Sequence, residues 1–244
     1  MEYASFLILP GNVPLVMVLI SPGEFMRLED GQPQFKVQIT KPFYMGKYKV
    51  TQAQWQTVMG SKPSQFKDDP ANPVEQVSLD DTQPFLTKLN DARLVNQWRF
   101  GLSTEACWEY ACRAGTTTVF PFGNSEIILG EYACYSASSQ NKTHAVGRLK
   151  PNSFGLHDML GNVWEWCDDW YIEGYYAQTP PCDPSGPTRG GRRVARGGGW
   201  DAHAADCRAA CRSGSAPSYR LNNLGFRLAL SFIGVPNKPV NETK

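Results

Sequence analysis

Cysteine and histidine are the residues of this sequence with the greatest capacity for metal binding or redox chemistry. The chain has seven cysteines and three histidines, and it contains no Cys-x-x-Cys pair. Cys207 and Cys211 would lie one turn apart in a helix, but so few histidines disfavour a cysteine–histidine zinc cluster. The odd number of cysteines favours buried free thiols, which pack as small apolar groups. A structural disulfide remains the alternative, because spacing alone does not assign one.

Short strands and three helices are the elements that we expect to position these groups. Apolar runs alternate with Gly and Pro in the first 50 residues, and the runs that predict strands are 16–20, 35–39 and 43–48. Capping residues predict helices that begin after Thr51, Ser78 and Thr104, the first through about residue 59 and the third over 105–113. After residue 115, turn formers and aromatic residues dominate, which indicates ordered loops.

The composition excludes several classes of function. With 41% hydrophobic and 12% aromatic residues, the 244-residue chain can build a substantial core, and its net charge of +1 gives no basic surface for nucleic acid. The apolar N-terminal stretch lacks a basic region and is interrupted by Pro10, Gly11 and Pro14, so neither a signal peptide nor a spanning helix is predicted. We therefore expect no nucleic-acid partner, no membrane insertion and, without an export signal, a cytoplasmic location.

A series of short motifs follows one another over residues 15–230. They are MVLI at 17–20, PGEFM at 22–26, KVTQAQW at 49–55, PVEQVS at 73–78, LSTEA at 102–106, WEYA at 108–111, PNSFGL at 151–156, GNVWEW at 161–166, RGGGW at 196–200 and GFR at 225–227. In this order they closely resemble the formylglycine-generating-enzyme (sulfatase-modifying factor) superfamily. The resemblance implies an α+β, C-type-lectin-like fold with small twisted antiparallel sheets, two or three helices and extensive ordered loops. We expect a single domain over residues 1–232 and a polar C-terminal tail over 233–244.

The resemblance also locates an oxidase site, and this sequence departs from it. Enzymes of the superfamily oxidise a substrate cysteine with two copper-binding cysteines, five positions apart, that follow the element found here at Gly197-Gly198-Gly199-Trp200. The first cysteine falls on Ala202 and the second on Cys207. At such a site the soft cuprous ion is held by two thiolates, and alanine supplies no donor atom. We therefore predict no copper and no catalytic residues.

The superfamily places a calcium ion at the segment that corresponds to GNVWEW. Residue by residue, the resemblance assigns it to Asp158, the carbonyl groups of Gly161 and Val163, and Glu165. Oxygen ligands of this kind suit a hard cation, so a structural calcium is expected. The alternative is that Asp158 and Glu165 accept hydrogen bonds from local groups without metal.

The segment 201–223, DAHAADCRAACRSGSAPSYRLNN, resembles the variable region of proteins that retroelements diversify. In those proteins template adenines, often in Asn codons, are randomised, which cannot produce Lys, Glu, Gln, Met or Trp. None of these types occurs between Asp201 and Asn223, although Lys, Glu and Gln are common elsewhere. The predicted variable positions are Asp201, Ala202, His203, Asp206, Cys211, Ser213, Gly214, Ser215, Ala216, Ser218, Tyr219 and Leu221. Three arginines in the segment, Arg208, Arg212 and Arg220, are interpreted as scaffold residues.

The sequence therefore predicts a non-catalytic ligand-binding protein that displays a diversified surface, with a variable region at about 199–223. Its ligand is expected to be another macromolecule, most readily a protein, because a small-molecule site needs deeper and more apolar walls. Two alternatives remain. One is a cysteine oxidase of the formylglycine-generating type, which the alanine at 202 disfavours, and the other is a fixed lectin-like interaction or signalling module. A non-variable Ala/Ser/Gly-rich loop would fit that last interpretation.

Overall fold

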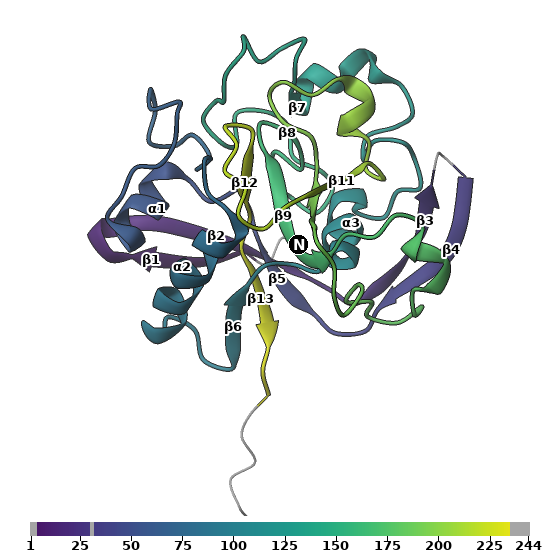
Figure 1. Cartoon of the computed structure of the whole chain (residues 1–244), viewed down its shortest axis with the longest axis horizontal. Helices are drawn as coiled ribbons and strands as arrows, with labels where there is room; N and C mark the ends of the chain where they lie inside the picture. The colour runs from purple at the N-terminus through teal and green to yellow at the C-terminus, as the bar shows by residue number, and fades with distance from the viewer. Residues whose placement is uncertain (1–3, 30–31, 235–244) are drawn as a thin grey trace, which may run out of the picture.

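The computed structural model describes residues 4–29 and 32–234. Within these residues the chain forms three α-helices, four β-sheets and short 3-10 turns joined by long ordered loops (Figure 1). The α+β class expected from the sequence is confirmed. The last ten residues of the expected tail lie outside the described residues.

The largest sheet brings together strands from both ends of the chain. Its five strands, in spatial order, are β1 (Ala4–Leu9), β2 (Val13–Ile20), β5 (Phe43–Gly46), β13 (Ala229–Phe232) and β6 (Trp98–Gly101). Every neighbouring pair is antiparallel, as expected. Leu15 and Met17 of β2 are buried in one core cluster, and Val18 and Ile20 are buried in the other, so this strand contributes to both. The predicted strands at 16–20 and 43–48 correspond to β2 and β5.

A second sheet contains part of the segment predicted to vary, residues 201–223, and the strand that follows it. Its four strands, in spatial order, are β11 (Arg212–Ser215), β10 (Arg193–Arg196), β9 (Trp164–Trp170) and β12 (Leu224–Phe226). β12 runs parallel to β9, whereas the other two pairs are antiparallel. The chain leaves the sheet at β11 on one edge and returns at β12 on the other. The intervening residues must therefore cross the sheet.

Two small two-stranded sheets complete the strand inventory of the described residues. β3 (Gly23–Glu29) and β4 (Gln32–Ile39) form an antiparallel hairpin, so the strand predicted at 35–39 is confirmed. β7 (Ala133–Cys134) pairs in parallel with β8 (Leu160–Gly161). The second pair joins two loops that are separated by more than twenty residues.

All three predicted helices are present, and local capping explains their positions. They are α1 (Gln52–Met59), α2 (Leu79–Asp91) and α3 (Glu105–Arg113). Thr51 and Ser78 each cap a helix in a reciprocal capping box, and Thr104 accepts a hydrogen bond from the backbone of Cys107. The third helix ends at Ala114, which adopts a left-handed conformation ahead of Gly115. Among the described residues after 115, helical structure is limited to short 3-10 turns: η2 (Glu126–Glu131), η3 (Tyr175–Gln178) and η4 (Ala204–Cys207).

The core lies in two clusters on either side of β9. One surrounds α3, where Trp108 is fully buried, and it extends to Cys207 and Ala209 of the second half. The other packs α1 and α2 against Phe226 of β12 and Trp166 of β9. Within residues 4–29 and 32–234, no helix has the length and apolar character needed to cross a membrane.

Candidate ligand-binding face

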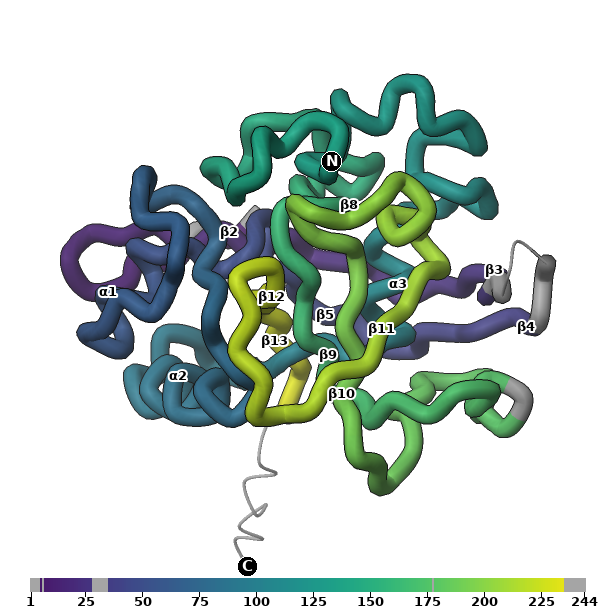
Figure 2. The backbone as a smooth tube through the Cα atoms, turned by 45° about the horizontal axis from the view of Figure 1, so that its top comes forward, coloured from purple at the N-terminus to yellow at the C-terminus, as the bar shows by residue number. Residues whose placement is uncertain are grey.

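The segment predicted to vary forms one continuous part of the surface. From β10 the chain passes through η4 and β11 and returns to β12, and Figure 2 shows this yellow-green path crossing the front of the molecule. Both of its ends are held at the start of β9, by Asn162 in the preceding loop and by Trp164, the first residue of the strand. The backbone N–H of Trp200 donates to the carbonyl of Asn162 at 2.7 Å, and the N–H of Trp164 donates to the carbonyl of Asn223 at 2.7 Å.

Most of the predicted variable positions have side chains that reach solvent. The exposed positions are Asp201, His203, Ser218, Tyr219 and Leu221. The partly buried positions are Asp206, Cys211, Ser213, Gly214, Ser215 and Ala216. Tyr219 is 56% exposed and Leu221 40%, which makes them the large apolar side chains of this segment that a partner could cover. We call residues 201–221 of this surface the variable face.

Packing against neighbouring residues constrains two of the predicted variable positions, Ala202 and Gly214. Ala202 is only 7% exposed and packs in the cluster around α3. Gly214 faces Tyr171 so closely that a Cβ atom built on it would lie 2.6 Å from the Tyr171 ring carbon Cγ. Because this contact involves the root of the tyrosine side chain, a larger residue at 214 would have to displace it. These positions are structurally constrained in a way that sequence alone did not reveal.

Arg196 forms the floor beneath the variable face. Its fully buried guanidinium donates to the carbonyl oxygens of Ala209 at 3.1 Å, Ala210 at 2.8 Å and Cys211. It also forms an ion pair with Glu109 of α3 at 2.7 Å. The three acceptors on the face are backbone atoms, so these bonds do not depend on which side chains the face carries.

Two of the three arginines interpreted as scaffold residues anchor the segment to fixed helices. Arg212 contacts both carboxylate oxygens of Glu105, with its Nε and Nη2 at 2.8 and 2.7 Å. Arg220 forms a similar two-point contact with Asp81 of α2, at 2.7 Å for each bond. Arg208 instead donates to the carbonyl of Ala205 within the segment and is exposed. The forked geometry of arginine explains the two-point contacts.

The thiols near the variable face are not activated. Ala202 and Cys207 both border Gly198, so the two positions of the family's cysteine pair lie side by side, with one sulfur present. Burial raises the pKa of Cys207 to about 12 and also raises the pKa of Cys211. A thiolate is the form that attacks electrophiles and binds metals. At neutral pH both groups are therefore protonated thiols, and all seven cysteines of the chain are free.

The predicted calcium ligands do not fit a calcium ion in the arrangement present. Glu165 is fully buried, and its carboxylate already accepts hydrogen bonds from Lys49 at 2.5 Å, Trp108 at 2.6 Å and Arg227 at 2.8 Å. Burial opposes its ionisation, but Arg227 and Lys49 lower the pKa of Glu165 to about 2. Asp158 has a left-handed backbone, and its Oδ2 accepts a hydrogen bond from the backbone of Gly147 at 2.7 Å.

The other two predicted ligands are backbone groups of the same loop. Gly161 has a φ of +72°, and a Cβ atom there would lie 2.2 Å from the carbonyl oxygen of Cys134. Val163 is fully buried. The loop is thus fixed by close backbone contacts and by the cations that hold Glu165.

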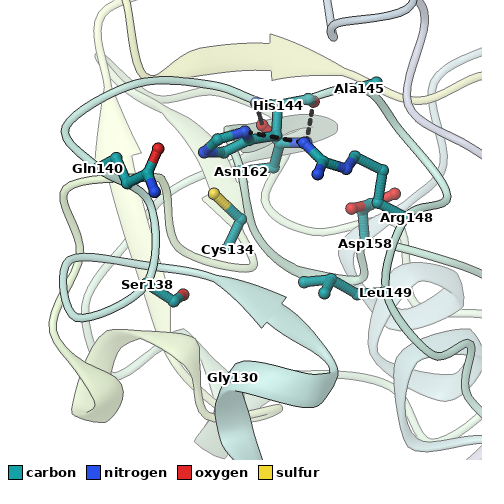
Figure 3. Close-up of a pocket in the computed structure, with 10 residues that line it drawn as sticks. All are labelled: Gly130, Cys134, Ser138, Gln140, His144, Ala145, Arg148, Leu149, Asp158 and Asn162. Carbon is teal, nitrogen blue, oxygen red and sulfur yellow. Dashed lines mark hydrogen bonds between the residues drawn. The ribbon is translucent and has the colours of Figure 1, made fainter.

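A pocket of about 320 Å³ lies among the loops between residues 130 and 162. Cys134, His144, Arg148 and Asp158 line it, as Figure 3 shows. The ring of His144 lies between the carbonyl of Ser139, 2.7 Å from Nε2, and the guanidinium of Arg148, 3.2 Å from Nδ1. Burial and the nearby Asp158 raise the pKa of the Cys134 thiol to about 12. The pocket has a mixed polar and apolar lining and contains no activated thiol, so the variable face remains the better candidate site.

Sequence reasoning missed the buried residues that support the site. Glu105, Glu109, Arg196 and Arg227 are nearly or fully buried, and Lys49 is buried completely. Each lies in a motif that was noted for its family resemblance, but no local pattern indicated its partner. A charged residue inside an otherwise apolar element was the available signal, because buried charges require partners.

The comparisons with known proteins agree with this geometry. Residues 11–232 match the family model of the sulfatase-modifying factor enzyme 1-like domain. The chain is 35% identical over 196 residues to the formylglycine-generating enzyme of Streptomyces coelicolor, covering 74% of this chain and 59% of that protein. It thus spans about three fifths of the length of that relative.

Two solved structures have the same fold. Variable protein 1 of Treponema denticola superposes with a TM-score of 0.86 at 30% identity, over 94% of this chain and 99% of that one. PvdO of Pseudomonas aeruginosa superposes with a TM-score of 0.77 at 28% identity, over 88% and 94% of the two chains. The fold is therefore C-type-lectin-like, as the motifs implied. With a family model that matches nearly the whole chain, this protein belongs to the family of sulfatase-modifying factor enzyme 1-like domains.

Proposed function

We propose that this protein is a non-catalytic ligand-binding protein that displays a retroelement-diversified surface on its C-type-lectin-like frame. The observation that carries the proposal is the way Arg196 holds the variable face by backbone carbonyls at residues 209–211. An anchor of this kind keeps the backbone in place while exposed side chains change. Antibody loops on a rigid sandwich follow the same logic.

Three further observations support the proposal. The ends of the segment are fixed by backbone bonds to Asn162 and Trp164, outside the segment. The residue types that adenine replacement cannot produce are missing from 201–223. The likeness to variable protein 1 of Treponema denticola extends over almost the whole chain at 30% identity.

The proposed ligand is a macromolecule, most readily a protein. Tyr219 and Leu221 project from an open face, and the polar side chains of Asp201 and His203 share that face. Broad exposed surfaces of this kind, with an aromatic anchor and polar surroundings, are typical of protein interfaces. A nucleic-acid ligand is not proposed, because the net charge of +1 does not predict a basic surface.

Sequencing of the 3′ end of the gene in a clonal population and in related isolates tests the proposal. Substitutions should be confined to adenine-templated codons between residues 201 and 223, and they should fall most often at exposed positions such as His203 and Tyr219. Arg196, Glu105 and Glu109 should not change. An invariant segment would contradict diversification and would favour the fixed interaction module.

A cysteine oxidase is the second candidate, and relatives named formylglycine-generating enzymes are the observation that favours it. Two features oppose it. Ala202 provides no ligand at the first cysteine position, and the remaining Cys207 is fully buried with a raised pKa. Incubation with Cu(I), oxygen and a cysteine-containing peptide should therefore leave the peptide unchanged. Copper-dependent conversion of that cysteine to formylglycine would establish the oxidase instead.

A further inference from the structure

Lys49 lies at an unusual place for a lysine. It lies between β5 and Thr51, the residue that caps α1, and its side chain is completely buried. Its ammonium group lies 2.5 Å from Oε1 of Glu165, which is also completely buried. A lysine is almost never found in the interior without a partner, so this ion pair is a fixed part of the structure.

The carboxylate of Glu165 is saturated by its neighbours. Besides Lys49, it accepts hydrogen bonds from the indole of Trp108 at 2.6 Å and from Nε and Nη2 of Arg227, the shortest at 2.8 Å. Arg227 also donates to the carbonyl oxygens of residues 46, 47 and 157. A calcium ion would have to displace these donors to reach Glu165.

The charges around the loop are already balanced. Asp158 lies close enough to attract the Lys49 ammonium, so two carboxylates, Asp158 and Glu165, face two cations, Lys49 and Arg227. A divalent ion added to this group would leave an excess of two positive charges in a buried region. Such an excess is costly where water cannot screen it.

We propose that the ammonium of Lys49 takes the place of a calcium ion at the 158–165 loop, and that this frame holds the variable face without metal. The loop matters to function because residues 162 and 164 bind the two ends of the variable segment. In this arrangement the chain itself provides the cation, so the position of the face does not follow the calcium concentration. The inference concerns the frame and stands whether or not residues 201–223 vary.

Thermal unfolding of the wild-type protein tests directly whether the frame is held without calcium. The Tm in excess EDTA should equal the Tm in excess CaCl₂, and calorimetric titration with CaCl₂ should give no binding heat. A wild-type Tm that rises with Ca²⁺, or a measured calcium affinity, would overturn the proposal. Because this test uses the unaltered chain, it decides the question even if variants of Lys49 do not fold.

A second experiment tests whether the Lys49 ammonium itself holds the loop. Lys49→Met replaces the side chain by an unbranched one that is a single heavy atom shorter and has no charge, and we expect its Tm to fall by roughly 5–10 °C. Lys150→Met is the matched control, because Lys150 forms an exposed pair with Glu131, and its Tm should stay near that of the wild type. Equal Tm values for Lys49→Met and wild type would show that the ammonium does not hold the loop.

Discussion

Nη2 of Arg196 lies 2.7 Å from Oε2 of Glu109, and both side chains are completely buried beneath the variable face. The pair joins β10 to α3 across 87 residues of sequence. Glu109 also accepts a hydrogen bond from Arg113 at 2.9 Å, so its carboxylate is held from its own helix. The variable face is therefore connected to α3 through Arg196 and Glu109, and neither residue is a predicted variable position.

Replacement of Arg196 should destabilise the protein strongly. Arg196→Met removes the cation beneath the face and leaves Glu109 with fewer partners, so we expect a loss of about 3–5 kcal/mol in the free energy of unfolding. Urea denaturation measures this loss. Arg208→Met is the control, because Arg208 is exposed and should change stability by less than about 0.5 kcal/mol. Similar losses for the two variants would contradict the anchoring role of Arg196.

Position 214 should tolerate substitution less well than its neighbours. A Cβ atom at Gly214 meets the root of the Tyr171 side chain, so Gly214→Ala should cost about 1–3 kcal/mol. Ser215→Ala on the same strand should be nearly neutral. Urea denaturation of both variants checks this difference, and population sequencing should show fewer substitutions at 214 than at 215. A neutral Gly214→Ala would show that Tyr171 moves freely.

Restoring the missing thiol should restore metal binding. Ala202 and Cys207 border the same glycine, so Ala202→Cys would place a second sulfur beside the first. Two adjacent sulfurs suit Cu(I), and we expect the variant to bind about one equivalent. Anaerobic competition against a chromophoric Cu(I) chelator measures the binding. The Ala202→Ser variant should behave like wild type, and equal copper binding by wild type and Ala202→Cys would contradict this interpretation.

Asp169 should make stability depend on pH. Burial and the neighbouring Glu105 raise the pKa of Asp169 to about 7, so the folded state retains a proton that the unfolded state releases at its usual pKa of 3.8. The stabilisation is present below about pH 4 and is lost as pH rises to about 7. Burial raises the pKa of Glu75 to about 7 as well, so both groups contribute.

The variant Asp169→Asn separates the two contributions. Asparagine can still accept the hydrogen bond from the backbone of Glu105, but it does not titrate. We expect the fall in unfolding free energy between about pH 5 and pH 7 to shrink by roughly half, from a wild-type change on the order of a few kcal/mol. Denaturation series across this range provide the measurement. An unchanged slope in Asp169→Asn would assign the effect to other groups.

The sequence alone determined the local structure and the family. Thr51 and Ser78 cap their helices through bonds that span only three residues, so the pattern needed to predict them is contained in a short window. The strands at 16–20 and 35–39 were likewise visible as apolar runs. The order of the motifs predicted the C-type-lectin-like fold, which the likeness to solved structures confirms. The presence of alanine instead of cysteine at position 202 was also visible directly in the sequence.

The tertiary structure decided which charges meet and which predicted positions face solvent. Lys49 and Glu165 are separated by 116 residues, and nothing local to either one indicates the other. The calcium ligands were assigned by resemblance, which could not show that a lysine occupies the carboxylate. Ala202 and His203 are neighbours in sequence, yet one is buried and the other exposed. In an irregular segment, side-chain direction follows no fixed period, so burial is set by packing against distant parts of the chain.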